Sequence, residues 1–187
     1  MASYIIGLGN PDKEYEHTRH NVGFMFLDFL AKKLDCEDFV LDKHLNALVT
    51  DGKADGTRVV LVKPLEFVNR TGNVVANIKR SAKVKPEHII LVHDDLDIPL
   101  GHAKQSYGKS SGGHKGVQSV IRALKTKDFW RIRIGTATTS LKRARTQSDK
   151  KRDAFVVGFV LSPFTKKEQE TLKTAIKEGY QKILTLL

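Results

Sequence analysis

The sequence predicts an α/β fold: a single-domain, three-layer α/β/α sandwich with a twisted mixed sheet. Short apolar, β-prone runs alternate along the 187 residues with segments of helical periodicity, as in a sheet covered by helices. The run Ile89–Val92 contains four apolar residues in succession, which is typical of a central strand covered on both faces. Neither an internal repeat nor a linker divides the chain, so 1–187 is expected to be one domain.

Five strands and two helices are expected up to residue 92. The first strand, residues 3–6, ends at the turn residues Gly7–Pro11. The helix over 21–34 is apolar on nearly all sides and should be buried. The remaining elements are short strands at 39–41 and 47–49, a stronger strand at 58–62, a helix after Gly72 and the strand at 89–92, with turns at 51–52 and 55–56.

The second half starts with a strand at 103–107 and a loop rich in glycine and serine at 108–116. A helix at 117–124 and an alternating strand at 130–134 follow. Residues 141–153 are polar and basic, which favours a mobile lid loop. The apolar run at 155–161 is expected to be the last strand. Thr165 should cap a closing amphipathic helix over 165–187.

Charge is distributed unevenly. Residues 101–152 carry fourteen Lys and Arg against two acids, a net of +12, whereas the remaining residues carry eighteen against nineteen. Such a block is typical of a surface that binds a polyanion, although a merely solubilising face is the alternative. Cys36 is the only cysteine, and no apolar run reaches the roughly 20 residues of a membrane span. A cytoplasmic protein without a membrane segment is expected, or a mitochondrial one if the source is eukaryotic.

Two nucleotide-binding motifs come close and fail. Gly7-Leu8-Gly9 opens like a dinucleotide fingerprint, but Asp12 stands where the third glycine belongs. Gly108-Lys109-Ser110 ends like a P-loop, yet the required first glycine is Ala103. No cofactor is therefore expected.

Polar groups gather where strands end, which is where open α/β folds place ligands. Asn10 follows the first strand, and Tyr15 and His20 come shortly after it. The sequence His93-Asp94-Asp95-Leu96-Asp97 follows the central run. One interpretation is a metal site of Asp94, Asp95 and Asp97, another is a carboxylate that orients a catalytic histidine, and the third is a polar turn.

Two further residues have open interpretations. Asn69 lies between a strand and a helix, where it is an N-terminal cap or, alternatively, a donor to a substrate carbonyl. His114, in the glycine loop, is a functional residue or only the start of a helix.

The combined motifs identify a resemblance to bacterial-type peptidyl-tRNA hydrolases. They are G-L-G-N-P-x-x-x-Y-x-x-T-R-H-N-x-G, F-x-N-x-T-G, H-D-D-L-D-x-P-x-G, G-G-H-x-G, R-I-R-I-G and V-G-F-V-L, in that order from Ile5 to Leu161. The resemblance implies a metal-free esterase that cuts the bond between a peptide and the 3′ ribose of tRNA. The tRNA would then be the partner of the basic block.

The resemblance also implies residue roles. His20 would be the general base that activates water, and Asp94 would orient it. The peptidyl end would be held by Asn10 and Asn69, with Tyr15, Phe67, His114 and Lys115 lining the substrate site. The tRNA would be bound by Lys104, Arg133, Lys142, Arg143 and Arg145. No metal, membrane or obligate protein partner is expected, and the chain is expected to be a monomer.

Three positions depart from the family pattern. Lys115 stands where the family usually has asparagine, Val68 where it has methionine, and Ser106 where a basic residue is common. A lysine donates hydrogen bonds but accepts none, and it brings charge into the site. Lys115 therefore keeps open the alternative of a non-catalytic tRNA- or RNA-binding protein on the same fold. A metal-dependent phosphoesterase is a third hypothesis, which insensitivity to a chelator would exclude.

Overall fold

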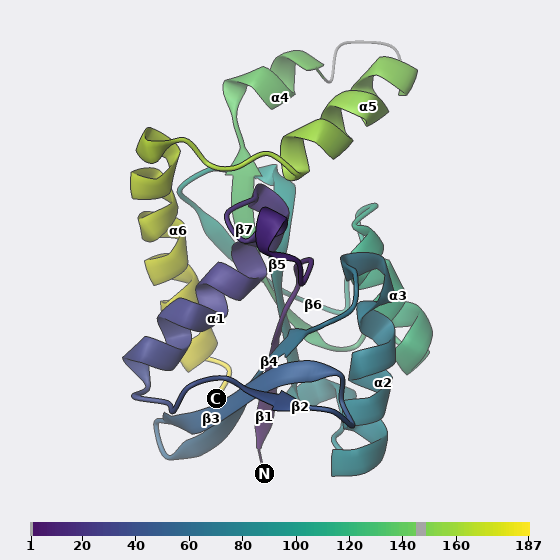
Figure 1. The fold of residues 1–187 in the computed structure, drawn as a ribbon, viewed down its shortest axis with the longest axis vertical. Helices are drawn as coiled ribbons and strands as arrows, with labels where there is room; N and C mark the ends of the chain where they lie inside the picture. The colour runs from purple at the N-terminus through teal and green to yellow at the C-terminus, as the bar shows by residue number, and fades with distance from the viewer. Residues whose placement is uncertain (1, 145–148) are drawn as a thin grey trace.

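Seven strands form one mixed sheet between two layers of helices in the computed structural model, which describes residues 2–144 and 149–187 (Figure 1). The order across the sheet is β2-β3-β4-β1-β5-β7-β6. The strands are β1 (Ser3–Gly7), β2 (Val40–Asp42), β3 (Ala47–Ala54), β4 (Thr57–Pro64), β5 (Ile89–Pro99), β6 (Ala103–Tyr107) and β7 (Trp130–Ala137). The predicted α/β/α fold is thereby confirmed.

The four middle strands, β4, β1, β5 and β7, run parallel. On either side, β3 and β6 pair antiparallel to them, and β2 pairs antiparallel to β3. Parallel strands end at the same edge of a sheet. The residues that follow β1 and those at the far end of β5 therefore meet, although they are more than 80 positions apart. This edge is where the predicted site residues gather.

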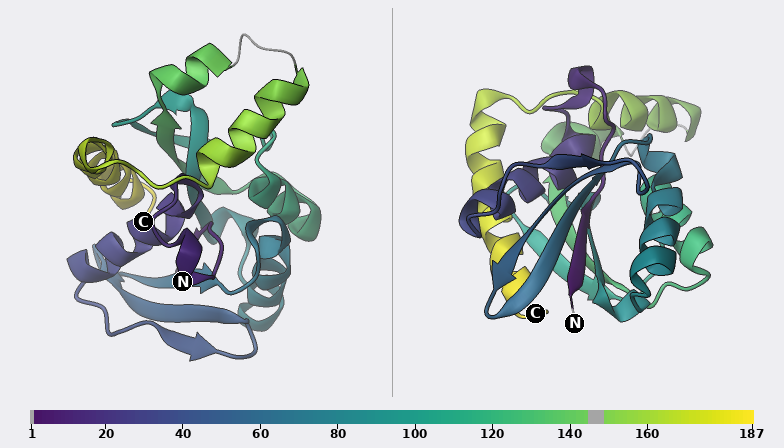
Figure 2. Two further views of the ribbon diagram at one scale, coloured as in Figure 1. Left: turned by 45° about the horizontal axis from the view of Figure 1, so that its top comes forward. Right: turned by 60° about the horizontal axis from the view of Figure 1, so that its bottom comes forward.

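Two helices cover each face of the sheet. On one face are α1 (Val22–Lys33) and α6 (Lys166–Leu184), and on the other are α2 (Thr71–Ala82) and α3 (Lys115–Leu124). Figure 2 shows the remaining helices, α4 (Thr139–Ala144) and α5 (Asp149–Val160), beyond the carboxyl end of the parallel strands. Four short 3-10 turns complete the described chain: η1 (Lys13–Tyr15), η2 (Arg19–Asn21), η3 (Val68–Arg70) and η4 (Pro86–His88).

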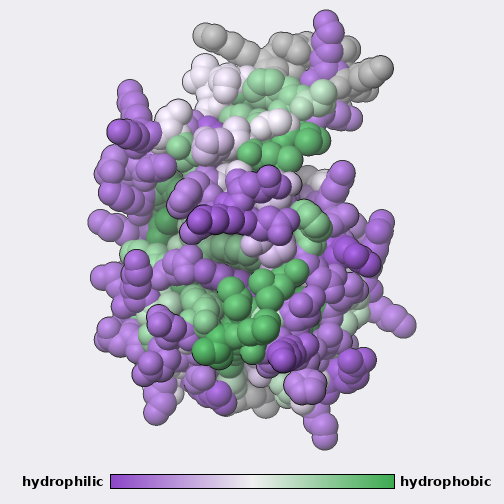
Figure 3. All heavy atoms as spheres, in the orientation of Figure 1, coloured by the Kyte–Doolittle hydropathy of each residue, from purple (hydrophilic) through white to green (hydrophobic). Residues whose placement is uncertain are grey.

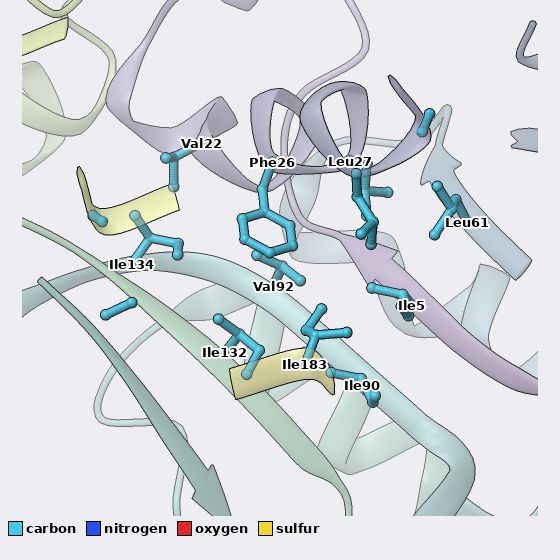
Figure 4. Packing of buried hydrophobic residues seen from close by; sticks show 14 of the residues in the cluster. Ile5, Val22, Phe26, Leu27, Leu61, Ile90, Val92, Ile132, Ile134 and Ile183 are labelled. Carbon is cyan, nitrogen blue, oxygen red and sulfur yellow. The ribbon is translucent and has the colours of Figure 1, made fainter. Parts of the chain in front are cut away.

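Each face of the sheet has its own hydrophobic core. On the α1 and α6 face, Phe26 packs among residues such as Val92 and Ile132 of the sheet and Ile183 of α6, all fully buried (Figure 4). The opposite core joins side chains of α2 and α3 to those of β1, β4 and β5. Burial of one such large apolar side chain contributes about 1.5–3 kcal/mol, so the two cores fix both helix layers onto the sheet.

The sequence prediction was wrong at four places. The central strand, expected at 89–92, continues to Pro99, so the polar residues after Val92 lie in β5 and not in a turn. β3 continues through Asp51 and Gly52, so the only turn of that hairpin is at 55–56. Within the expected lid loop, 139–144 and 149–153 are helical, in α4 and α5. The expected strand at 155–161 is instead the end of α5. Its apolar run suits a strand by propensity, but tertiary context overrides propensity: in the helix, Phe159 is buried against the guanidinium of Arg19.

The closing helix was predicted correctly. Thr165 caps α6 in a full capping box, in which its hydroxyl accepts from the backbone N–H of Glu168 and the Glu168 carboxylate accepts from the backbone N–H of Thr165.

The face shown in Figure 3 is mostly hydrophilic, with apolar side chains gathered at its lower middle, where β2 crosses in Figure 1. Val40 and Leu41 of β2 are among the large apolar residues that are exposed. Among the described residues, no helix has the length and apolar character needed to cross a membrane.

Candidate active site

His20 and Asp94 meet at the carboxyl edge of the parallel strands. His20 lies in η2, which connects β1 to α1, and Asp94 lies on β5. Their Nδ1 and Oδ1 atoms are 2.8 Å apart, and the two side chains are 13% and 3% exposed. Gly23 makes the approach possible, because a Cβ there would collide with the backbone of Val92 and Leu8. The predicted pairing of a histidine with an orienting carboxylate is present in the structure.

His114 donates a second hydrogen bond to the same carboxylate oxygen. Its Nδ1 accepts the backbone N–H groups of Gly116 and Val117 at 3.2 and 3.4 Å and so caps α3. In the neutral ring the proton therefore lies on Nε2, which is 3.0 Å from Asp94 Oδ1. His114 is thus both a helix start and a member of the site. The helix start is confirmed, and the bond to Asp94 shows that the cap of α3 is not the only contact His114 makes.

These contacts determine the protonation of the pair. Burial opposes charge on Asp94, but His20 and His114 hold the pKa of Asp94 well below its usual value. Burial lowers the pKa of His20, the charge and hydrogen bond of Asp94 raise it by more, and Lys115 lowers it again; the net pKa is raised. When His20 is neutral, Nδ1–H donates to Asp94 and Nε2 remains as the basic nitrogen.

His93 contacts both Asp94 and His114, a role that the sequence did not predict. Its side chain is fully buried, and its Nδ1 lies 2.7 Å from the backbone oxygen of Asp94. Its ring packs against that of His114 with centroids 4.7 Å apart. Burial, followed by the nearby His114, lowers the pKa of His93 well below its usual value, so the ring is neutral.

Asn10 is held rigidly beside this site. Its backbone exchanges two hydrogen bonds of 2.9 Å with the side chain of Asn21, the residue after His20. Its Oδ1 accepts the backbone N–H of Val68 at 3.0 Å, which leaves Nδ2 as the donor to a ligand. Asn21 belongs to the first family motif, but the sequence predicts no role for it. Its two hydrogen bonds with Asn10 depend on the fold.

Asn69 does not cap α2, so that alternative was wrong. The N-cap residue is Arg70, and the Asn69 side chain is exposed in a groove that Lys115 also lines. Phe67, 48% exposed, and Tyr15 form an edge-to-face ring pair with centroids 6.4 Å apart. The predicted substrate-binding residues thus come from three separate segments of the chain.

The predicted tRNA-binding residues divide into two groups. Lys104 of β6 pairs in register with Arg133 of β7, so both lie on one face of the sheet. Arg133 Nε donates to Asp95 at 2.8 Å, and its side chain remains 26% exposed. Lys142 and Arg143 lie on α4, but their side chains and all of Arg145 fall outside the described residues.

The acidic metal site is not supported. Asp94 is engaged by two histidines and Asp95 by Arg133. Among the described residues, the group with ligand atoms close enough for a metal is His20, Asp94 and His114, not the three aspartates. Both histidines of this group are hydrogen-bonded to Asp94.

Arg19 joins the site to the carboxyl-terminal elements, and sequence reasoning missed it as well. Its guanidinium donates to the Ser162 hydroxyl at 2.7 Å, to the Pro163 carbonyl at 2.7 Å and to Glu168 at 2.7 Å. It also lies over the ring of Phe159 on α5, at 4.4 Å from the centroid. The residue next to His20 is therefore bound to the connection between α5 and α6.

The chain resembles peptidyl-tRNA hydrolases throughout its length. The sequence model of the peptidyl-tRNA hydrolase family matches residues 4–187. The protein of that name from Sulfurihydrogenibium is 40% identical over 187 residues, which are 100% of this chain and 92% of the relative. The one from Aquifex aeolicus is 42% identical over 175 residues, covering 94% and 84%. The crystal structure of peptidyl-tRNA hydrolase from Acinetobacter baumannii superposes with a TM-score of 0.86 at 31% identity, covering 99% of this chain and 88% of the other.

Proposed function

The chain belongs to the peptidyl-tRNA hydrolase family, and on that premise we propose how its residues carry out the reaction. The substrate is peptidyl-tRNA, and the bond that is hydrolysed is the ester between the peptide and the tRNA. An ester is a reactive acyl compound. A positioned water, a base and hydrogen-bond donors for the developing oxyanion are therefore sufficient, and no covalent nucleophile is needed.

His20 is the general base. Its Nε2 takes a proton from water as the water attacks the ester carbonyl, and it then returns that proton to the ribose oxygen that leaves. Asp94 keeps the Nδ1 proton in place and stabilises the imidazolium that forms. His114, by its bond to the same oxygen of Asp94, is a positioning residue in this proposal.

The carbonyl oxygen needs donors as charge develops on it. Asn10 Nδ2 is suited to this, because the other end of its amide is fixed by Val68. Asn69 and Lys115 supply further donors from the groove, and the exposed ring of Phe67 with Tyr15 forms an apolar platform for the substrate.

The tRNA part of the substrate lies over the basic block. Lys104 and Arg133, on neighbouring strands, bind phosphates without reading bases. Lys142, Arg143 and Arg145 add charge in the segment around α4. The enzyme is proposed to work as a cytoplasmic monomer without a metal. The observation that carries the whole proposal is the hydrogen bond between His20 and Asp94, at the edge where two parallel strands end.

The test is hydrolysis of N-acetyl-aminoacyl-tRNA, in EDTA, by the wild type and His20→Ala. A general base contributes about 10²–10⁴-fold, so the variant is expected to lose that factor in kcat. His44→Ala is the matched control, because His44 is an exposed histidine on the β2–β3 connection. Full activity of His20→Ala, or loss of wild-type activity in EDTA, would contradict the proposal.

A further inference from the structure

A polar groove runs along the α2–α3 side of the site and away from it. Its volume is about 660 Å³, in the range of roughly 300–1,000 Å³ that is usual for ligand sites. The lining residues are Asn69, Gly72, Asn73, Ser111, Gly113, Lys115, Gln118, Ser119, Arg122 and Ala123. The groove adjoins the site, because Gly113 and Lys115 of its lining flank His114, which is hydrogen-bonded to Asp94.

The groove is cationic. Lys115 and Arg122 are exposed, and no acid is among the described residues that line it. In the part of the chain that the structure describes, neither cation forms an ion pair; the nearby Glu66 is bound instead to Asn73 and Arg70. Both positive charges are therefore available to a ligand.

The groove lies between α2 and α3, which stand side by side at the right of Figure 1. Lys104 and Arg133 are on the same face of the sheet as these helices, because their strand neighbours belong to the core on the α1 and α6 face: Ala103, Ile132 and Ile134. Asn69 and Lys115, which donate to the peptidyl carbonyl in the proposed function, line the groove, so the peptide is expected to continue along it. The side-chain amides and hydroxyls of the groove suit the carbonyl and N–H groups of a peptide backbone.

We propose that the groove between α2 and α3 receives the peptide and that Lys115 and Arg122 make it prefer acidic side chains. This proposal rests on the assignment of His20 as the general base, because that assignment fixes where the ester lies. Lys115 and Arg122 are seven residues apart on α3, which is roughly 10 Å along the helix axis. An extended peptide advances about 3.3 Å per residue, so Arg122 faces the residue about three positions before the esterified one.

The test uses N-acetylated tetrapeptidyl-tRNAs that carry Glu, Gln or Lys at the amino-terminal position and Ala elsewhere. Values of kcat/KM are expected to fall in the order Glu, Gln, Lys. The ratio of Glu to Lys should be about three- to tenfold at low salt, because exposed ion pairs are individually weak, and it should shrink as salt is added. Equal rates for the three substrates would overturn the proposal.

Arg122→Glu is expected to reverse the order, whereas Arg80→Glu, an exposed arginine farther along α2, is expected to leave it unchanged. N-acetyl-aminoacyl-tRNA is too short to reach Arg122 and should be cleaved equally by both variants. A uniform loss on every substrate, the short one included, would place RNA in the groove and overturn the proposal. Failure of the proposed base would look different, because His20→Ala would then keep full activity on every substrate.

Discussion

At Asp94, one carboxylate oxygen accepts N–H groups from two histidines that lie far apart in the sequence. The bonds to His20 and His114 are 2.8 and 3.0 Å. Hydrogen bonds to a charged acceptor are about twice as strong as neutral ones, so each histidine helps to keep Asp94 ionised. An ionised Asp94 in turn raises the pKa of His20. The base is thus stronger than an ordinary histidine, and more of it is protonated at neutral pH.

Lys115 opposes this effect, which leads to a prediction for Lys115→Asn. Without the lysine charge, the pKa of His20 should rise further. The base works only when it is neutral, so the rate falls below that pKa. The acid limb of the kcat profile is therefore expected to move to higher pH in this variant. The measurement is kcat against pH with N-acetyl-aminoacyl-tRNA.

Lys115→Arg, which keeps the charge, is the control. It should leave the acid limb of the kcat profile at the pH of the wild type. A shift of the limb to lower pH in Lys115→Asn would show that Lys115 does not act on His20 through its charge.

At the scale of elements, the side chain of Arg19 connects η2 to the α5–α6 connection and to the start of α6. Its side chain is 6% exposed, and its partners are the Ser162 hydroxyl, two backbone carbonyls and Glu168. The planar guanidinium has five N–H donors in a fixed fork, whereas a lysine has three donors on one nitrogen and a glutamine has two.

Arg19→Gln is therefore expected to lower the free energy of unfolding by about 1–3 kcal/mol, because buried acceptors lose their donors. Urea unfolding, followed by the fluorescence of Trp130, measures this. Arg58→Gln is the matched control: Arg58 pairs with Asp51 at the surface, 62% exposed, and such pairs contribute about 0–1 kcal/mol. Equal effects in the two variants would mean that the contacts of Arg19 add nothing beyond an exposed ion pair.

At the scale of the whole molecule, the α/β/α sandwich with its mixed sheet and the edge that carries the site were predictable, because they follow from the pattern of apolar runs. Asn10 comes shortly after the end of β1, His20 lies in the connection from β1 to α1, and Asp94 lies on β5 just beyond Val92, where the pairing of β5 with β1 ends. Their meeting therefore required no knowledge of side-chain positions. Roles for individual residues beyond these came only from the family motifs.

The remainder depends on contacts that no local pattern encodes. Phe159 belongs to a β-prone run, yet it lies in a helix, where its ring packs against the guanidinium of Arg19. The bonds of Asn21 to Asn10 and of His93 to Asp94 likewise depend on backbone positions. Asn69 was expected first as a cap, since asparagine favours that position, but the 3-10 turn η3 moves the start of α2 beyond it.

The uneven charge of the chain leads to the last prediction, which concerns tRNA affinity. A net charge of +12 over residues 101–152 should make the Kd for tRNA rise steeply with salt, because each phosphate contact releases counterions. Removing one contact lowers the slope of log Kd against log salt by about 0.7–0.9. Lys104→Gln, at the strand beside Arg133, is expected to do so, whereas Lys53→Gln, on β3 near the opposite edge of the sheet, is not. Titration of tRNA at several KCl concentrations separates the two, and equal slopes for both variants would mean that the phosphates do not lie along β6 and β7.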